Sequence, residues 1–186
     1  MKPITLTPGK PLSPPDVASV ARGEARLEVG PQSHRAISAC RASLERRLAS
    51  GHTHYGINTG FGSLSTQRIP DSDLATLQRN LIRSHASGVG EPLPTEVVRG
   101  MMTVLAASLA RGHSGVRAMV VEQIVAMLNA GIAPVVPESG SVGASGDLAP
   151  LAHVALCMIG EGEAVVEGQR MPAGEALRKA GIDPLT

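Results

Sequence analysis

The scarcity of aromatic side chains is the feature that most limits what this chain can fold into. It has no tryptophan, and its single tyrosine and single phenylalanine, Tyr55 and Phe61, lie in one glycine-rich segment. The core must therefore be filled by Leu, Val, Ile, Met and Ala, and the spacing of these residues sets the fold. Tyr55 is expected either to act through its hydroxyl group or to bury its ring in ordinary packing.

Aliphatic residues recur at helical spacing along most of the chain. Residues 33–49, for example, place Ile37, Cys40, Leu44 and Leu48 on one stripe. The segment 51–70 is rich in Gly, Thr and Ser and is expected to form a loop. A mainly α fold follows, with a small β-hairpin around Glu167-Gly168 and glycine-rich loops. The predicted helices span 16–27, 33–49, 71 or 72 to about 87, 95–110, 115–129, 147–159 and 172–180.

The composition excludes several classes of partner. The net charge is +1 and the sequence has no basic cluster, so neither nucleic acid nor a membrane surface is an expected partner. Cys40 and Cys157 are far apart on apolar helical faces, which is typical of core residues in a reducing compartment. The sequence also has no apolar run long enough to span a bilayer. A cytoplasmic location is expected.

The glycine-rich stretch 140–153 contains a tripeptide that can make an electrophile from its own backbone. If the amide nitrogen of Gly146 attacks the carbonyl carbon of Ala144, a five-membered ring closes. Loss of two waters, one of them from the hydroxyl of Ser145, leaves a conjugated methylidene-imidazolone. Gly146 has no Cβ to resist the strained approach, and side chains otherwise supply few electrophiles.

Simpler interpretations of the same residues stay open. The stretch also suits a flexible loop in which Ser145 or Asp147 caps the next helix, or a phosphate cradle, although the Gly-Lys-Ser/Thr ending of a P-loop is missing. His52 and His54 could begin a metal site, but no third ligand lies nearby, so no metal is expected. For His153, the alternatives are polar packing and placement of the loop.

Three blocks of the sequence together resemble the aromatic amino acid ammonia-lyase family. They occur in the family's order, and the stretches between them also read like the family, so the resemblance covers essentially the whole chain. Ser84-His85 is the pair found in histidine-type members. The blocks are His54-Tyr-Gly-Ile-Asn-Thr-Gly-Phe-Gly62, Asn80-Leu-Ile-Arg-Ser-His-Ala-Ser-Gly88 and Gly140-Ser-Val-Gly-Ala-Ser-Gly-Asp-Leu-Ala-Pro-Leu-Ala-His153.

The resemblance implies a role for each matching residue. Tyr55 would be the catalytic base, which requires hydrogen bonds or positive dipoles that favour its anion. His85 would contact the substrate imidazole, with Ser84 leaving room for that ring. The tripeptide Ala144-Ser145-Gly146 would form the cofactor. The remaining implied residues are Gly62 for substrate binding and Gly143, Asp147 and Asn58 for support of the cofactor loop.

The family's activity is the elimination of ammonia, here from L-histidine to give urocanate, with a self-formed 4-methylidene-imidazol-5-one and no external cofactor. The resemblance implies that residues 1–186 are the N-terminal, cofactor-forming helical domain of a longer lyase with the fumarase/aspartase-like fold. The C-terminal bundle, which completes the site, would come from the same gene product or from a complementing chain. Family members are homotetramers whose sites draw on several subunits. The alternatives are a non-catalytic remnant and a lyase for another aromatic amino acid.

Overall fold

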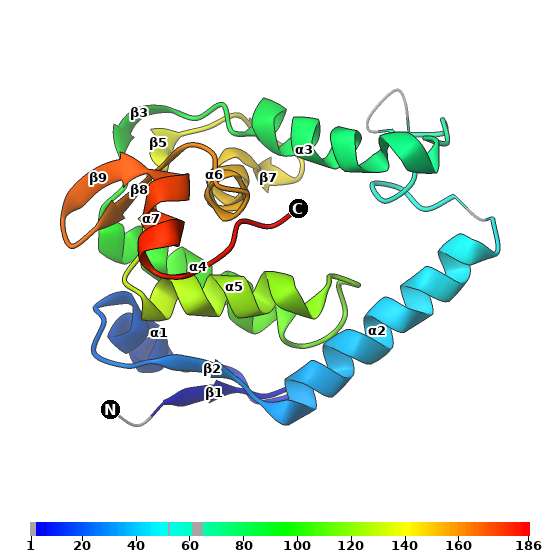
Figure 1. Cartoon of the computed structure of the whole chain (residues 1–186). Helices are drawn as coiled ribbons and strands as arrows, with labels where there is room; N and C mark the ends of the chain where they lie inside the picture. The colour runs from blue at the N-terminus through cyan, green and yellow to red at the C-terminus, as the bar shows by residue number, and fades with distance from the viewer. Residues whose placement is uncertain (1–2, 52, 61–64) are drawn as a thin grey trace.

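The computed structural model describes residues 3–51, 53–60 and 65–186. The fold is mainly helical, as predicted, with short strands between the helices (Figure 1). No helix within the described ranges combines the length and the apolar character needed to cross a membrane. The helices are α1 (Pro14–Ala21), α2 (Pro31–Ala49), α3 (Leu74–His85), α4 (Thr95–Leu109), α5 (Ala118–Asn129), α6 (Ala149–Met158) and α7 (Ala173–Lys179), with a 3-10 turn, η2 (Asp71–Asp73), before α3.

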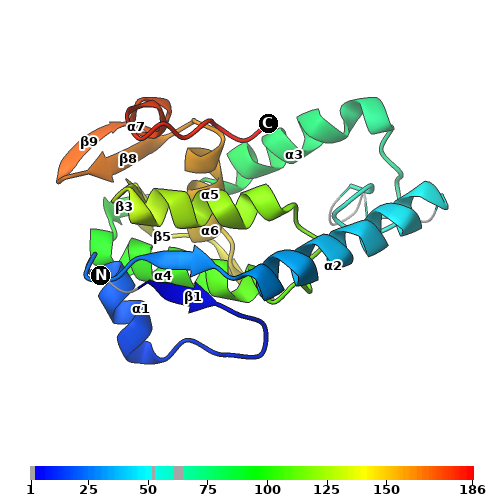
Figure 2. The same ribbon diagram turned by 60° about the horizontal axis from the view of Figure 1, so that its bottom comes forward.

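Helices α4 and α5 form the centre of the molecule. They pack against each other, α1 packs on α4, and α2 and β2 (Leu27–Val29) lie against α5 (Figures 1 and 2). The largest fully buried side chains are aliphatic or methionine, as the shortage of aromatic residues predicted. They include Met102 from α4 and Ile124, Met127 and Leu128 from α5.

A buried arginine joins three of these elements. The guanidinium of Arg99, which is 7% exposed, donates to the carbonyls of Val20 and Ala21 at 2.8 Å and to that of Leu128 at 2.9 Å. These carbonyls lie in the last turns of α1 and α5, where helices leave acceptors without intrahelical partners and where a cation is favoured. Arg99 therefore ties the C-terminal ends of two helices to α4.

The predicted first helix, 16–27, is too long. Helix α1 ends at Ala21, and Gly23 adopts a left-handed φ of +76°, which turns the chain away. Leu27 then begins β2, which pairs in parallel with β1 (Ile4–Leu6), a contact that the sequence pattern did not predict. The side chain of Asn129 holds β2 against α5, because it accepts from the Leu27 N–H at 3.0 Å and donates to the Leu27 carbonyl at 2.9 Å.

The described residues form three further strand groups. The predicted hairpin is present as β8 (Glu163–Val166) and β9 (Gln169–Pro172), and β4 (Ala133–Pro134) pairs with β8. Strand β3 (Val89–Pro92), which follows α3, pairs antiparallel with β5 (Pro137–Ser139). Strands β6 (Val142–Gly143) and β7 (Gly146–Asp147) follow β5 directly and form a small hairpin before α6.

Candidate active site

The tripeptide lies at the tip of the hairpin that β6 and β7 form. Val142 pairs with Asp147 and Gly143 pairs with Gly146, so Ala144 and Ser145 make the turn. Gly146 has φ +83°, in the left-handed region that favours glycine. Residues 140–146 are all exposed. The hairpin therefore presents the backbone of the tripeptide outward on a tight turn.

Asp147 fixes the base of this hairpin. Its Oδ1 accepts from the backbone N–H of Ala149 at 3.0 Å, and its carboxylate lies so close to Gly140 that a Cβ at that position would collide with it. The sequence pattern had suggested that a helix begins at Asp147. Because Asp147 pairs in β7, helix α6 begins at Ala149 instead. One carboxylate thus touches both ends of the segment 140–149.

A pocket of about 320 Å³ brings the tripeptide together with the predicted substrate-binding pair. Ser84 and His85, the last two residues of α3, line one side, and the hairpin and the start of α6 line the other. The lining residues are Ser84, His85, Ser87, Ser141, Gly143, Ala144, Ser145, Gly146, Leu148 and Ala149. Segments about sixty residues apart in sequence thus share one cavity.

The hydrogen bonds of His85 define the chemistry of its outer nitrogen. Its Nδ1 lies 2.9 Å from the carbonyl oxygen of Leu81 and 3.2 Å from the Oγ of Ser84. A carbonyl only accepts, so this contact assigns the proton to Nδ1 in the neutral ring. Nε2 is then a hydrogen-bond acceptor, suited to an N–H group in the pocket.

The loop that carries Tyr55 lies apart from this pocket. In Figure 1 the connection from α2 to α3 is at the N-terminal end of α3, whereas β7 lies near its C-terminal end. Tyr55 is 67% exposed and is not a lining residue of the pocket. Gly62 lies outside the described residues.

Asn58 organises the loop in which Tyr55 lies. It is 4% exposed, and its Oδ1 accepts from the backbone N–H of His54 at 2.7 Å. Its carbonyl accepts from the N–H of Ile69 at 3.0 Å, which joins the two sides of the loop. These contacts place Asn58 as a support for the tyrosine loop, whereas the sequence had indicated support for the cofactor loop; that role stays a prediction.

Neither metal-ligand clusters nor a disulfide are found among the residues that the structure describes. No group of three or more His, Cys, Asp or Glu side chains in these ranges could hold a metal ion. Cys40 and Cys157 are both free, and burial raises the pKa of the Cys157 thiol to about 12. At neutral pH Cys157 is therefore a protonated core residue, as its position on an apolar helical face predicted.

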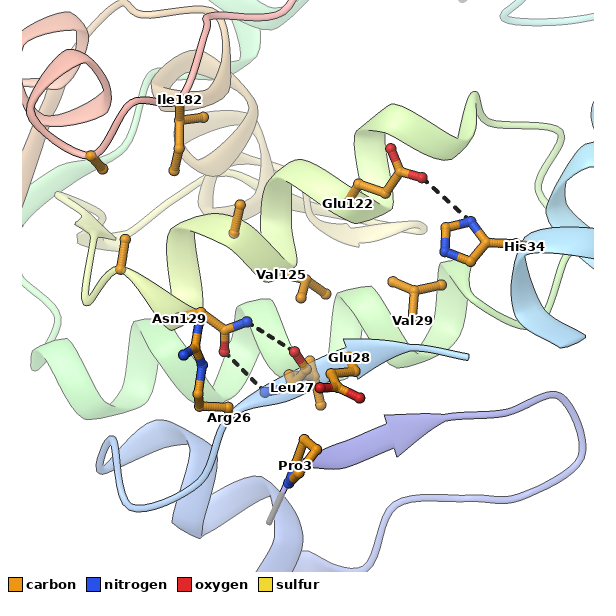
Figure 3. Close-up of a pocket in the computed structure, with 13 residues that line it drawn as sticks. Pro3, Arg26, Leu27, Glu28, Val29, His34, Glu122, Val125, Asn129 and Ile182 are labelled. Carbon is orange, nitrogen blue, oxygen red and sulfur yellow. Dashed lines mark hydrogen bonds and ion pairs between the residues drawn. The ribbon is translucent and has the colours of Figure 1, made fainter. Parts of the chain in front are cut away.

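A larger cavity, of about 860 Å³, lies on another side of the molecule, between β2, α5 and the C-terminal segment (Figure 3). Three of its polar side chains, those of His34, Glu122 and Asn129, have partners within the cavity wall. The Nδ1 of His34 lies 3.3 Å from Glu122, and Asn129 bonds to the backbone of Leu27. None of the site residues predicted from the sequence lines it. The smaller pocket is therefore the better candidate for the active site.

Sequence reasoning missed several residues of this pocket. Ser87, Ser141 and Leu148 line it, and all three lie inside the blocks already singled out, at 80–88 and 140–153. Their position inside these blocks was therefore the one sequence signal that could have indicated them. Their side chains belong to common types with no distinctive chemistry, so only the three-dimensional arrangement identifies them.

Comparison with known proteins finds the same family that the three sequence blocks resemble. Residues 12–186 match the family described as aromatic amino acid lyase. A histidine ammonia-lyase of Geobacillus thermodenitrificans is 56% identical over 83% of this chain and 31% of its own length. One from Anaeromyxobacter dehalogenans is 50% identical over 97% of this chain and 37% of its own. The crystal structure of histidine ammonia-lyase from Trypanosoma cruzi superposes with a TM-score of 0.88 at 38% identity, over 98% of this chain and 35% of that one.

Proposed function

We propose that this chain, which belongs to the aromatic amino acid lyase family, forms a 4-methylidene-imidazol-5-one and serves in the elimination of ammonia from L-histidine to give urocanate. The observation that carries the proposal is the shared pocket of the Ala144-Ser145-Gly146 turn and the Ser84-His85 pair. The chain spans about a third of the length of the curated relatives named above. The complete site is therefore proposed to include groups from the region that these relatives have in addition.

The residues at the hairpin tip fit the cofactor. Ring closure joins the Gly146 nitrogen to the Ala144 carbonyl carbon, so both must lie on one tight turn, as the pairing of Gly143 with Gly146 supports. The left-handed φ of Gly146 removes the steric barrier that a side chain would add. Asp147, anchored to Ala149 and packed on Gly140, limits the motion of the turn. No external cofactor is needed.

The ring, once formed, supplies an electrophilic carbon that makes the substrate amine a better leaving group. The role proposed for His85 is to accept a hydrogen bond from the substrate imidazole N–H through its Nε2, because its Nδ1 is engaged with the Leu81 carbonyl. Ser84 leaves room beside it for the ring. An apolar substrate ring has no N–H to donate, and an unpaired acceptor in the site costs free energy, which favours histidine over phenylalanine.

Tyr55 is proposed as the base that removes the β-proton. Its loop joins α3 at the end opposite the tripeptide, and within one chain Tyr55 is not among the residues that line the pocket. This separation supports an assembly in which a neighbouring copy delivers Tyr55, in keeping with the homotetramer expected from the family. The proposed location is the cytoplasm.

The test is turnover of L-histidine by the intact protein, followed by the absorbance of urocanate. Wild type is expected to release urocanate, whereas Tyr55→Phe keeps the cofactor but loses turnover because no base remains. His85→Leu is expected to shift preference from L-histidine toward L-phenylalanine. A Tyr55→Phe variant with near-normal turnover would remove the base assignment. Absence of urocanate from a wild-type protein that carries the ring would favour either a non-catalytic remnant or a different aromatic substrate.

A further inference from the structure

The pocket wall that carries Ser84 and His85 is connected to the hairpin by a short path of strands. Helix α3 ends at His85, residues 86–88 lead into β3, and β3 pairs with β5. Strand β5 leads through residues 140–141 into the β6 and β7 hairpin, and α6 follows. The Leu93 N–H donates to the Val136 carbonyl at 2.8 Å and extends this pairing. Gly88 is the last residue before β3 and follows Ser87, which lines the pocket.

A histidine on α6 closes this path into a ring of contacts. The Nε2 of His153 accepts from the backbone N–H of Gly88 at 3.2 Å. A Cβ placed on Gly88 would lie 3.2 Å from that nitrogen and 3.2 Å from the Cβ of Pro137, so the glycine is held between α6 and β5. The bond needs a neutral imidazole with its proton on Nδ1. His153 thereby joins the helix after the tripeptide to the segment after the Ser84-His85 pair.

An ion pair makes a second, weaker connection between the same helices. The guanidinium of Arg83 donates to both carboxylate oxygens of Glu161, at 2.8 and 2.7 Å, just beyond the end of α6. Their side chains are 50% and 34% exposed. Exposed ion pairs are screened by water and salt and hold geometry loosely. The bond from Gly88 to His153 is half-buried and follows directly on Ser87, which lines the pocket, so it is the firmer of the two connections.

We propose that His153 is a positioning residue for the lyase site, which sets the separation between the Ser84-His85 pair and the tripeptide by holding Gly88. The expected effect on turnover rests on the proposed function, whereas the contact between His153 and Gly88 is independent of it. Reacting groups must be held to within about 0.5 Å of the productive geometry. A displacement of the wall by about 1 Å can lower the rate on the order of 100-fold.

The test compares substitutions at the two ends of this bond. His153→Leu removes the acceptor, whereas His153→Gln keeps one at a similar distance from the backbone. Gly88→Ala retains the N–H but crowds the contact with His153 and Pro137. Glu161→Gln, which weakens the exposed ion pair, is the matched control. Each protein is examined by intact mass, by hydrogen exchange of segment 84–92, and by kcat and KM for L-histidine and L-phenylalanine.

Ring formation, read from the mass, is expected in all four variants. In His153→Leu and Gly88→Ala, segment 84–92 should exchange faster and kcat/KM for L-histidine should fall about 10- to 100-fold. The fall should be smaller for L-phenylalanine, which makes no hydrogen bond to His85. His153→Gln should recover most of the loss, and Glu161→Gln should stay within about twofold of wild type. If His153→Leu does not fold, Gly88→Ala and His153→Gln still decide the matter.

Normal exchange and normal kinetics in His153→Leu or Gly88→Ala would overturn the positioning role. So would a loss in His153→Leu that His153→Gln does not recover. Failure of the proposed function would look different, because wild type would then produce no urocanate while the exchange of segment 84–92 still responded to His153→Leu.

Discussion

Helix α5 and the tripeptide hairpin lie at opposite extremes of burial in the same fold. Helix α5 buries the side chains of Val121, Gln123, Ile124, Val125, Met127 and Leu128, whereas residues 140–146 are all exposed. Stability should therefore reside in the aliphatic core around α4 and α5, and the residues proposed for chemistry should add little to it. Substitutions in the two regions should separate folding from function.

The largest expected effect on stability comes from the core. Ile124→Ala removes a side chain that is 0% exposed and leaves a cavity, so the free energy of unfolding should fall by about 2–5 kcal/mol. Val142→Ala in the hairpin, where the side chain is 74% exposed, is the matched control and should change it by less than about 0.5 kcal/mol. Denaturant titration measures both. Similar losses in the two variants would contradict the contrast between the regions.

An intermediate effect is expected where α5 meets β2. Asn129→Ala removes both hydrogen bonds to Leu27 at a half-buried position, and the free energy of unfolding should fall by about 1 kcal/mol. His34→Ala, which removes an exposed contact with Glu122 in the same cavity, should cost less. Finding the reverse order by denaturant titration would show that β2 is held mainly by other contacts.

The smallest effect is a pH dependence from His153. Burial lowers the pKa of His153 below its ordinary value of 6.5, so the unfolded chain binds this proton more tightly than the folded protein. Its contribution to stability is fully present above pH 6.5 and is lost as the pH falls through the lowered pKa of the folded state. His153→Gln should lack this part of the loss when unfolding is measured from about pH 7.5 to about pH 5. Parallel profiles for the two proteins would contradict it.

The helical core could be predicted from the sequence because its signal is local. The stripe that includes Ile37 and Leu44 and the apolar run through α4 repeat at helical spacing, and these helices are present. The β1 and β2 pair was missed because strands of three residues carry no periodic signal and depend on a distant partner, Asn129. The first helix was extended too far because its pattern continued past Gly23, whose left-handed φ ends it.

The site could be predicted only in part. The tripeptide and the Ser84-His85 pair could be recognised from the sequence as parts of two blocks. That they line one pocket depends on the pairing of β3 with β5, which the sequence pattern does not predict. The distance of Tyr55 from that pocket is likewise a property of the fold, and the role of Tyr55 stays a prediction. The sequence left polar packing and placement of the loop open for His153. Its contact with Gly88 could not be predicted, because a backbone N–H and a neutral histidine carry no pattern in the sequence.

The intact mass of the purified chain tests the central claim most directly. If the Ala144-Ser145-Gly146 turn forms the cofactor, the mass is lower than that of the sequence by two waters. Ser145→Ala, which has no hydroxyl to eliminate, should lack the conjugated ring and the loss of the second water while folding with unchanged stability. An unmodified mass for folded wild-type protein would contradict the account, because the hairpin would then be an ordinary turn beside a pocket.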